Sequence, residues 1–387
     1  MVRGRDRTLR IEPFGVEIWM NAHEGRCELN LAETCIHSLT LRELTKLARC
    51  SRRPLDGLMD TRLTYGAIEG SDGLRQAIAA TYADHPADGI LVTHGTAGAN
   101  MLVHRALIEP GDVVVAVCPT YQQHCSIPES LGGEVREVWL REAQGWSLGM
   151  DELEAAAQGA RLIALTNPNN PTGAALRRPE METLAGIAER AGCWLLVDEV
   201  YRGLEQGEPV PSVADLTDLG ISTCGMSKAY GLAGLRLGWI AGPPDVLAAA
   251  AVHRDYDTIS VGMVDDHLAT IALQARDAVL GRSRALIAVN RLLLGEWAVS
   301  EPSVRCVVPD AGTTALLRYD AGLPSEALCL ALLDETGVLL TPGAAMGMEG
   351  YLRLGAGCEP GILREGLARL SGFLARRRAV DPERRRA

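Results

Sequence analysis

Residues 227–236 read Ser-Lys-Ala-Tyr-Gly-Leu-Ala-Gly-Leu-Arg and lie between two short apolar stretches, 221–224 and 237–241, that predict strands. A lysine nucleophile must be partly desolvated before its amine becomes reactive. An arginine can bind two oxygens of a phosphate at once. Because Lys228 and Arg236 share one glycine-rich loop directly after a predicted strand, the segment favours a reactive amine beside an anion site. A solvated loop is the alternative for a lone lysine.

Lysine is rare in this chain. Of 38 Lys and Arg residues, only Lys46 and Lys228 are lysines, so chemistry that needs an amine side chain has two candidates. The formal net charge of −11 argues against a nucleic-acid partner, because a phosphate backbone selects clustered Lys and Arg. The arginine-rich end, residues 376–386, is short and contains acids, and we interpret it as a frayed, solvated helix end.

Composition narrows the class of protein further. The chain has 387 residues, 47% of them hydrophobic, which is enough for one large domain and a smaller one. Its ten cysteines include no CxxC pair, so we expect no metal site and reduced thiols in the cytoplasm. No apolar run resembles a signal segment or could span a bilayer, so we expect no membrane partner.

Predicted strands and helices alternate through the middle of the chain. Continuous apolar strands separated by helices indicate an α/β fold, a three-layer α/β/α domain whose mostly parallel sheet is buried on both faces. The predicted strands are 89–93, 112–118, 134–140, 161–166, 193–197, 221–224 and 237–241, and the predicted helices are 72–84, 96–108, 150–158 and 180–191.

The two ends of the chain differ from this middle part. We predict helices at 16–24 and 39–50 with an extended piece at 27–32, then a second block after residue 275. That block contains a long helix, strands at 305–308, 314–318, 338–341 and 351–354, a helix from Ser325 and a closing helix at 360–376. We therefore divide the chain into an N-terminal segment that covers the active site and joins the small domain (1–50), a large domain (51–275) and a small α+β domain (276–387).

Polar motifs follow several predicted strands. Asp198-Glu199-Val200-Tyr201 begins where a buried strand ends, which is where open α/β sheets bind ligands, although a helix cap or a surface turn would also use an acid there. Asn167-Pro168-Asn169-Asn170-Pro171-Thr172-Gly173 follows another strand, and this order is rare as turn chemistry alone.

Further candidates are more ambiguous when taken singly. Small residues at 93–99, before a predicted helix, could bring backbone N–H groups to an anion, but no GxGxxG spacing supports a dinucleotide. Tyr121 could stack on an aromatic ligand or lie half-buried beside its turn. Arg353, between leucines on a short strand, needs an anion partner: a substrate carboxylate or an intramolecular acid.

Together these segments resemble the class I/II aminotransferases of PLP fold type I, from about Asn30 to the C-terminal helix and in the family's order. The resemblance implies pyridoxal 5′-phosphate (PLP) as cofactor, with Lys228 as the Schiff-base lysine and the general base. It implies Asp198 as the partner of the ring nitrogen, which keeps the ring electron-poor so that it stabilises a carbanion.

The remaining roles are implied in the same way. The ring oxygen would contact Asn170, which also reaches substrate, and the catalytic Tyr201, while Tyr121 stacks on the ring. Arg353 would bind the substrate carboxylate. The phosphate would be held by Gly95, Thr96, Ala97 and Arg236, and across a homodimer interface by Tyr65 of Tyr65-Gly66-Ala67-Ile68-Glu69-Gly70.

The sequence departs from the family's pattern at two places. Three residues before the lysine the family usually has Ser or Thr, whereas this chain has Gly225, and backbone donors or Ser227 could compensate. Where the segment that covers the substrate usually becomes glycine-rich, this chain continues after Asn30 with Leu-Ala-Glu-Thr-Cys. Glu33 in that run could bind a cationic group of the substrate, or the segment could cap a helix.

These residues identify the cofactor better than the product. Transamination is the first hypothesis; β- or γ-elimination, replacement, cyclisation or oxidation of a cationic amino acid is the alternative. The stretch at 253–260 and the Lys228 loop are similar to those of capreomycidine-synthase-like cyclases, and residues 29–34 are similar to arginine oxidases. S-adenosylmethionine also lies within the family's range. A non-enzymatic effector domain of a transcription regulator is disfavoured, because only a short segment precedes the fold.

Overall fold

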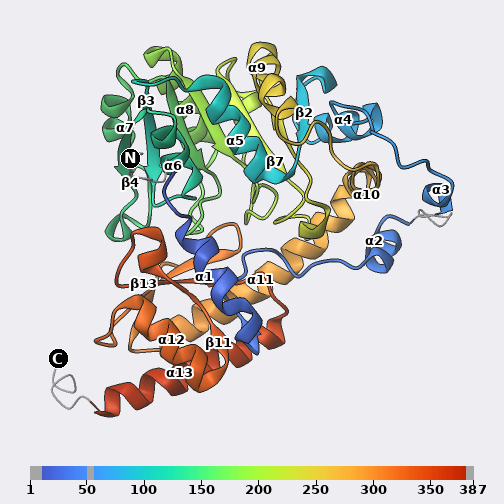
Figure 1. Cartoon of the computed structure of the whole chain (residues 1–387). Coiled ribbons are helices and arrows are strands. Elements are labelled where there is room, and N and C mark those ends of the chain that lie inside the picture. Colours follow the sequence, from blue (N-terminus) through green and yellow to red (C-terminus); the bar gives the residue numbers. More distant parts are fainter. Residues whose placement is uncertain (1–10, 50–55, 381–387) are drawn as a thin grey trace, which may run out of the picture.

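A seven-stranded sheet is built from residues 90–241 in the computed structural model, which describes residues 11–49 and 56–380 (Figure 1). Neighbouring strands run β4-β3-β5-β6-β7 in parallel, whereas β8 is antiparallel to both β7 and β2. The strands are β2 (Ile90–Thr93), β3 (Val113–Cys118), β4 (Glu134–Trp139), β5 (Leu162–Thr166), β6 (Trp194–Asp198), β7 (Gly220–Gly225) and β8 (Gly238–Ala241). The predicted α/β class with a mostly parallel sheet is confirmed.

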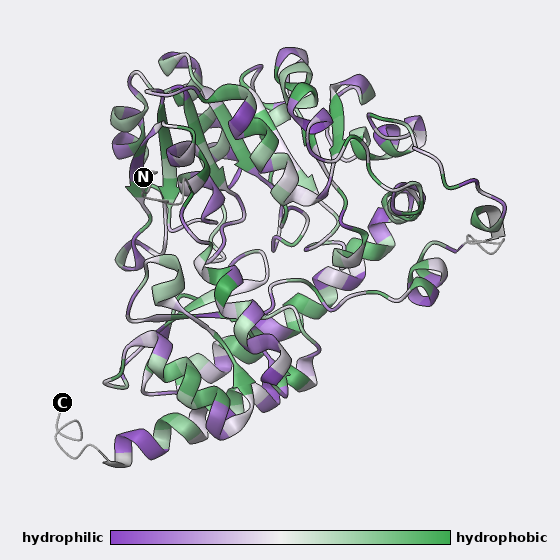
Figure 2. Ribbon diagram, in the orientation of Figure 1, coloured by the Kyte–Doolittle hydropathy of each residue, from purple (hydrophilic) through white to green (hydrophobic). Residues whose placement is uncertain are grey.

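Helices cover both faces of this sheet, because successive strand residues point to opposite sides. Leu162 and Ala164 of β5 pack with α5 (Gly95–Leu107) and α9 (Pro244–Asp255). Ile163 and Leu165 pack on the other face with α7 (Met150–Ala157) and α8 (Arg178–Ala191). Figure 2 shows the resulting band of hydrophobic residues along the strands between the helical layers.

A second, smaller sheet lies in the C-terminal part (Figure 1). Its order is β12-β13-β10-β9, with all neighbours antiparallel. The strands are β9 (Val304–Cys306), β10 (Thr314–Tyr319), β12 (Thr341–Pro342) and β13 (Tyr351–Gly355), and the helices of this part are α11 (Arg276–Ser300), α12 (Ser325–Thr336) and α13 (Pro360–Val380). The domain boundaries at 50/51 and 275/276 stay predictions.

The N-terminal segment connects to this C-terminal part. β1 (Leu29–Asn30) pairs in parallel with β11 (Val338–Leu339), while α1 (Gly15–His23) packs nearby through a hydrogen bond from the Trp19 indole to the Leu340 carbonyl, 2.9 Å. A single strand at 338–341 was therefore a wrong prediction. The chain turns at Leu340, so that its first half pairs with β1 and its second half with β13.

Other boundaries also differ from the prediction. α4 (Asp72–Ala79) ends before residue 84, and α2 (Leu41–Leu47) is shorter than 39–50. Four helices had not been predicted, namely α3 (Asp56–Met59), α6 (Gln123–Ser130), α9 and α10 (Met263–Gln274). The predicted helix end at Cys50 lies outside the described residues. None of the described helices is long and apolar enough to cross a bilayer.

The arginine-rich end was predicted to fray, and for its first residues this is wrong. α13 continues through Arg378, because acids from neighbouring elements pair with its guanidinium groups. Arg377 contacts Glu335 at 2.8 Å, and Arg378 contacts the buried Glu301 at 2.6 Å. Residues 381–387 lie outside the described part of the chain.

The sheet topology brings the sequence motifs to one edge. β3, β5 and β6 run in parallel, so the segments that carry Tyr121, Asn170 and Asp198 all leave the sheet at its carboxyl edge. β7 is parallel to them and leads into the loop with Lys228. This is the edge at which open α/β sheets bind ligands.

Candidate active site

A cavity of about 380 Å³ lies at this carboxyl edge, beneath the N-terminal segment. All the predicted site residues except Gly95 and Tyr65 line it: Glu33, Thr96, Ala97, Tyr121, Asn170, Asp198, Tyr201, Ser227, Lys228, Arg236 and Arg353. Residues of the N-terminal segment and of the C-terminal part therefore meet residues from the sheet in one cavity.

Lys228 points toward the N-terminal segment. Its Nζ donates to Thr34 Oγ1 at 2.7 Å and lies 3.3 Å from Cys35 Sγ and 3.7 Å from Glu33 Oε1. Burial lowers the pKa of Lys228, but Cys35, Tyr201 and Glu33 together raise it above its ordinary value. Without a bound ligand, Lys228 is therefore a charged ammonium. It must lose a proton before its amine can act as a nucleophile.

Glu33 is the counter-ion of that ammonium. Its Oε1 accepts the N–H groups of Thr34 and Cys35, both at 2.7 Å. Burial disfavours the charged carboxylate, but Lys228 and these hydrogen bonds lower the pKa of Glu33 to about 2. The carboxylate is thus ionised at any working pH, and its charge faces the cavity.

Asp198 is buried at the end of β6, with 3% of its surface exposed. Its Oδ2 accepts from Asn100 Nδ2 at 2.9 Å, and its Oδ1 accepts from the Val200 N–H at 3.1 Å. Asn100 is fixed in turn by the Thr223 hydroxyl, which donates to its Oδ1 at 2.6 Å. Burial raises the pKa of Asp198 to about 6, although Asn100 and Val200 oppose this shift. Within the described part of the chain, no cationic side chain forms a salt bridge with this carboxylate.

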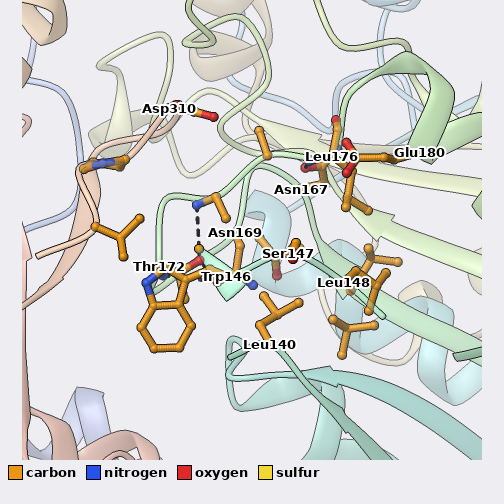
Figure 3. A pocket seen from close by; sticks show the side chains of 18 of the residues that line it. Leu140, Trp146, Ser147, Leu148, Asn167, Asn169, Thr172, Leu176, Glu180 and Asp310 are labelled. Carbon is orange, nitrogen blue, oxygen red and sulfur yellow. Dashed lines mark hydrogen bonds between the residues drawn. The ribbon is translucent and has the colours of Figure 1, made fainter. Parts of the chain in front are cut away.

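In the loop 167–173, one asparagine faces the cavity, and the other two form hydrogen bonds that hold the loop in place. Asn167 Oδ1 accepts the Leu176 N–H, and Asn169 Oδ1 accepts from the Thr172 hydroxyl at 2.7 Å. Asn170 is left to line the cavity. A separate pocket of about 320 Å³ lies behind the loop, where Leu140, Trp146 and Leu148 gather around Asn169 and Thr172 (Figure 3). That pocket contains none of the predicted site residues.

The opposite end of the cavity is suited to an anion. Thr96 is in the first turn of α5, where backbone N–H groups have no partner within the helix. Its hydroxyl is buried and has no hydrogen-bond partner among the described residues. Arg236 lies across from it: a Cβ on Gly95 would come within 2.9 Å of the Arg236 Nη2. The Arg236 Nη1 donates to Ser227 Oγ at 3.4 Å.

Gly225 now has a physical explanation. A Cβ at this position would lie 2.5 Å from Thr96 Oγ1 and 3.0 Å from the Leu237 carbonyl oxygen. Residue 225 must therefore be glycine while Thr96 occupies that space. The start of α5 therefore places the Thr96 hydroxyl in the space beside Gly225.

The comparisons with known proteins agree with this arrangement. The family model described as aminotransferase class I and II matches residues 37–370. The chain belongs to this family. The aminotransferase family depends on PLP, so the resemblance seen in the sequence is confirmed at the level of the family.

Individual relatives of this aminotransferase-family chain include more than one activity. The chain is 32% identical to capreomycidine synthase of Streptomyces vinaceus, over 92% of each chain. It is 30% identical to an arginine–pyruvate transaminase of Pseudomonas aeruginosa, over 82% of this chain and 84% of that one. A solved PLP-dependent aminotransferase from Streptococcus suis is similar with a TM-score of 0.92 and 39% identity, over 95% of this chain and 99% of that one.

Arg353 carries a buried charge without an acidic partner among the described residues. It is 4% exposed, and its donors reach only neutral oxygens: Asn170 Oδ1 at 3.4 Å, the Ala32 carbonyl at 3.3 Å and Thr341 Oγ1 at 3.2 Å. The intramolecular salt bridge that was the alternative for Arg353 is absent from the described part of the chain. Because a buried charge without a counter-ion is costly, this guanidinium is suited to an anionic ligand.

The tyrosines behave differently from one another. Tyr201 is fully buried and Tyr121 lies against the Phe14 ring, with centroids 4.9 Å apart, while its hydroxyl donates to Glu17 Oε1 at 3.4 Å. Burial raises the pKa of both phenols, so both are protonated donors. Tyr65 is 74% exposed and lies outside the cavity of its own chain.

Three side chains that contact Lys228 or Asp198 had not been predicted as part of the site. Thr34 and Cys35 contact Lys228, and Asn100 holds Asp198. Asn100 was detectable in principle, because it is a polar residue on the buried face of a helix that mostly buries apolar side chains. The contact of Thr34 with Lys228 joins residues 194 positions apart and left no local signal.

Proposed function

We propose that this chain binds PLP and transfers the amino group of an α-amino acid to a keto acid. The observation that carries the proposal is a single cavity lined by an amine, a buried carboxylate and a buried guanidinium, those of Lys228, Asp198 and Arg353. These are the groups needed to hold an aldehyde, a positively charged ring and a substrate carboxylate.

The phosphate of PLP fits the anion end of the cavity. The unpartnered Thr96 hydroxyl and the N-terminal N–H groups of α5 are donors, and Arg236 supplies positive charge. Ser227 and Ala97 complete this end, and Gly95 leaves room for Arg236 to approach.

The ring of PLP fits between Asp198 and the tyrosines. A protonated ring nitrogen would supply the cationic partner that the Asp198 carboxylate does not have among the described residues. Tyr121 offers an aromatic face on which the ring could stack. Tyr201 and Asn170 would hydrogen-bond the ring oxygen. PLP, when bound, supplies an aldehyde that combines with amines and a ring that accepts electrons from the substrate Cα.

The protein's own residues would then position the substrate and move its proton. Arg353 binds the α-carboxylate, so the Cα faces the Lys228 amine. Once Lys228 is neutral and released from the cofactor, its Nζ would accept the Cα proton and pass it to the former aldehyde carbon, which leaves the amino group on the cofactor and a keto acid as product. The Thr34 hydroxyl, 2.7 Å from Nζ, holds the amine in place through these steps.

Supplying amino acids one at a time tests the reaction type. We expect PLP-loaded protein to convert one equivalent of its amino acid to a keto acid, and to turn over repeatedly only after pyruvate or another keto acid is added. The measurement is keto-acid and amino-acid content by mass spectrometry. Repeated turnover without an acceptor, with release of ammonia or water or consumption of oxygen, would contradict transamination and favour the elimination, cyclisation or oxidation alternative.

A cationic amino acid is the second candidate for the substrate. Glu17, Glu24 and Glu33 all line the cavity on the side of the N-terminal segment. When Lys228 gives up its charge, the Glu33 carboxylate loses its counter-ion, and a guanidinium or ammonium group of the substrate could replace it. Relatives named for arginine and for capreomycidine agree with this candidate.

Glu33→Gln tests the cationic substrate directly. Gln keeps an oxygen for the Thr34 and Cys35 N–H groups but removes the charge, so we expect KM for arginine to rise at least about tenfold, or about 1.4 kcal/mol. KM for citrulline, which has the same shape without the charge, should change less than about threefold. Glu28→Gln, in an exposed ion pair, is the control. Equal losses for arginine and citrulline would exclude this role of Glu33.

A homodimer with shared sites belongs to the same proposal. Met59, Leu63 and Tyr65 expose between 74% and 82% of their surface. Large apolar side chains gathered along one stretch indicate a surface that another protein covers. A second copy there would cover Tyr65 and allow it to reach the partner's phosphate.

A further inference from the structure

Two cysteines and a glutamate come together beside the cavity, from three different elements. Cys118 ends β3, Cys125 is in the first turn of α6, and Glu137 is on β4. The two sulfurs lie 3.8 Å apart, and one ligand atom from each of the three residues lies within 4.8 Å of the others. This is the one such cluster of potential metal ligands among residues 11–49 and 56–380.

The separation of the sulfurs is that of two ligands on one metal ion. Two thiolates bound to zinc at about 2.3 Å with a tetrahedral angle between them are about 3.8 Å apart. A disulfide requires about 2.05 Å. The pair would therefore have to move to form a disulfide, whereas it already has the spacing of a metal site.

The carboxylate of Glu137 is also fixed in its orientation. The Trp139 indole N–H donates to Glu137 Oε2 at 3.0 Å, and Trp139 is paired with Cys118 across the β3–β4 ladder. Carboxylates that bind metal ions are commonly held in place by a hydrogen-bond donor of this kind. The cluster opens to a cavity of about 380 Å³ that Glu12 also lines, which gives an ion a path from solvent.

A metal ion would hold Cys118 and Cys125 as thiolates. Two thiolates at this distance repel each other strongly in the absence of a positive charge. A divalent ion between them removes that penalty, and binding releases protons.

We propose that Cys118, Cys125 and Glu137 bind a thiophilic divalent cation, zinc in the cell, with water in the fourth position. The absence of a CxxC pair had predicted no such site, but the spacing of seven residues is closed by the turn from β3 into α6. That turn carries Tyr121. The ion would therefore fix the loop that presents Tyr121 to the active site, a positioning role that needs neither substrate nor PLP.

The test uses the chain without PLP, so its result does not depend on the proposed reaction. We expect protein purified under reducing conditions to contain one zinc per chain and, after exchange, to bind one Co²⁺ with a thiolate-to-cobalt charge-transfer band. Cys118→Ser and Cys125→Ser should abolish the band, and Glu137→Gln should weaken Co²⁺ binding at least about tenfold. Cys306→Ser, a partly buried cysteine of the small sheet, should leave both unchanged.

Two results would overturn the proposal. One is the absence of a saturable charge-transfer band in the wild-type chain, including the case in which mass spectrometry finds a Cys118–Cys125 disulfide instead. The other is binding that persists in Cys118→Ser or Cys125→Ser. Glu137 is exposed, so Glu137→Gln is the variant to measure if a cysteine variant does not fold. Unchanged affinity for Co²⁺ in Glu137→Gln would then overturn the proposal.

Discussion

Replacing Lys228 with alanine is expected to lower kcat by at least about 10⁴-fold, the upper range for loss of a general base alone. Lys228 is the only lysine that lines the cavity, and its Nζ is held by Thr34 Oγ1 and faced by Glu33. Steady-state turnover of the preferred amino acid measures the effect. The variant should keep its fold, because Lys228 is only partly buried.

The chain offers a matched control for this experiment. Lys46 is the only other lysine, and it is exposed on α2 outside the cavity. Borohydride reduction of the PLP-loaded protein, followed by peptide mass spectrometry, should place the cofactor on residue 228 alone. Lys46→Ala should label and turn over like the wild type. A label on Lys46, or full activity in Lys228→Ala, would remove the basis of the proposed function.

The motifs were predictable because parallel strands gather their carboxyl ends. Asp198 and Asn170 each follow an apolar strand, and Lys228 follows β7, so a parallel sheet brings them to one edge. Nothing more than strand direction is needed for this inference. Strand direction alone did not predict the role of Arg353. The sequence left open whether its partner is a substrate carboxylate or an acid of the same chain.

Contacts between distant segments were not predictable in this way. Thr34 reaches Lys228, and β1 pairs with β11, because the N-terminal segment folds across the sheet edge. Short polar stretches of this kind have no periodicity that fixes where they lie. The proximity of Cys118 to Cys125 depends likewise on α6, a helix with Pro128 inside it that the pattern of apolar residues did not reveal.

Substituting Asp198 with asparagine should have the second-largest effect. Asn has the shape of Asp but cannot pair with a positive ring nitrogen, and breaking a buried ion pair costs about 3–5 kcal/mol. That corresponds to about two to four powers of ten in PLP affinity and turnover. Equilibrium dialysis of PLP and kcat/KM measure the two. Glu205→Gln is a matched control, because Glu205 is also a buried carboxylate but lies outside the cavity.

Asp198 should also make the free energy of unfolding of the PLP-free chain depend on pH in a specific way. Burial raises the pKa of Asp198 to about 6 from 3.8. For an acid whose pKa is higher in the folded state, the contribution to stability is complete below the unfolded value and is lost as pH rises through the folded value. The PLP-free wild type should therefore lose about 2 kcal/mol relative to Asp198→Asn between pH 4 and pH 6.5.

Urea unfolding of both PLP-free proteins across that range measures this difference, and other titrating groups cancel because both proteins contain them. PLP should reverse the loss in the wild type alone. A ring cation beside Asp198 would stabilise the charged carboxylate, which burial has deprived of water. Free energies of unfolding that run parallel in the two proteins, with and without PLP, would show that Asp198 carries no unpaired charge. The carboxylate would then have to be assigned a structural role with Asn100 instead.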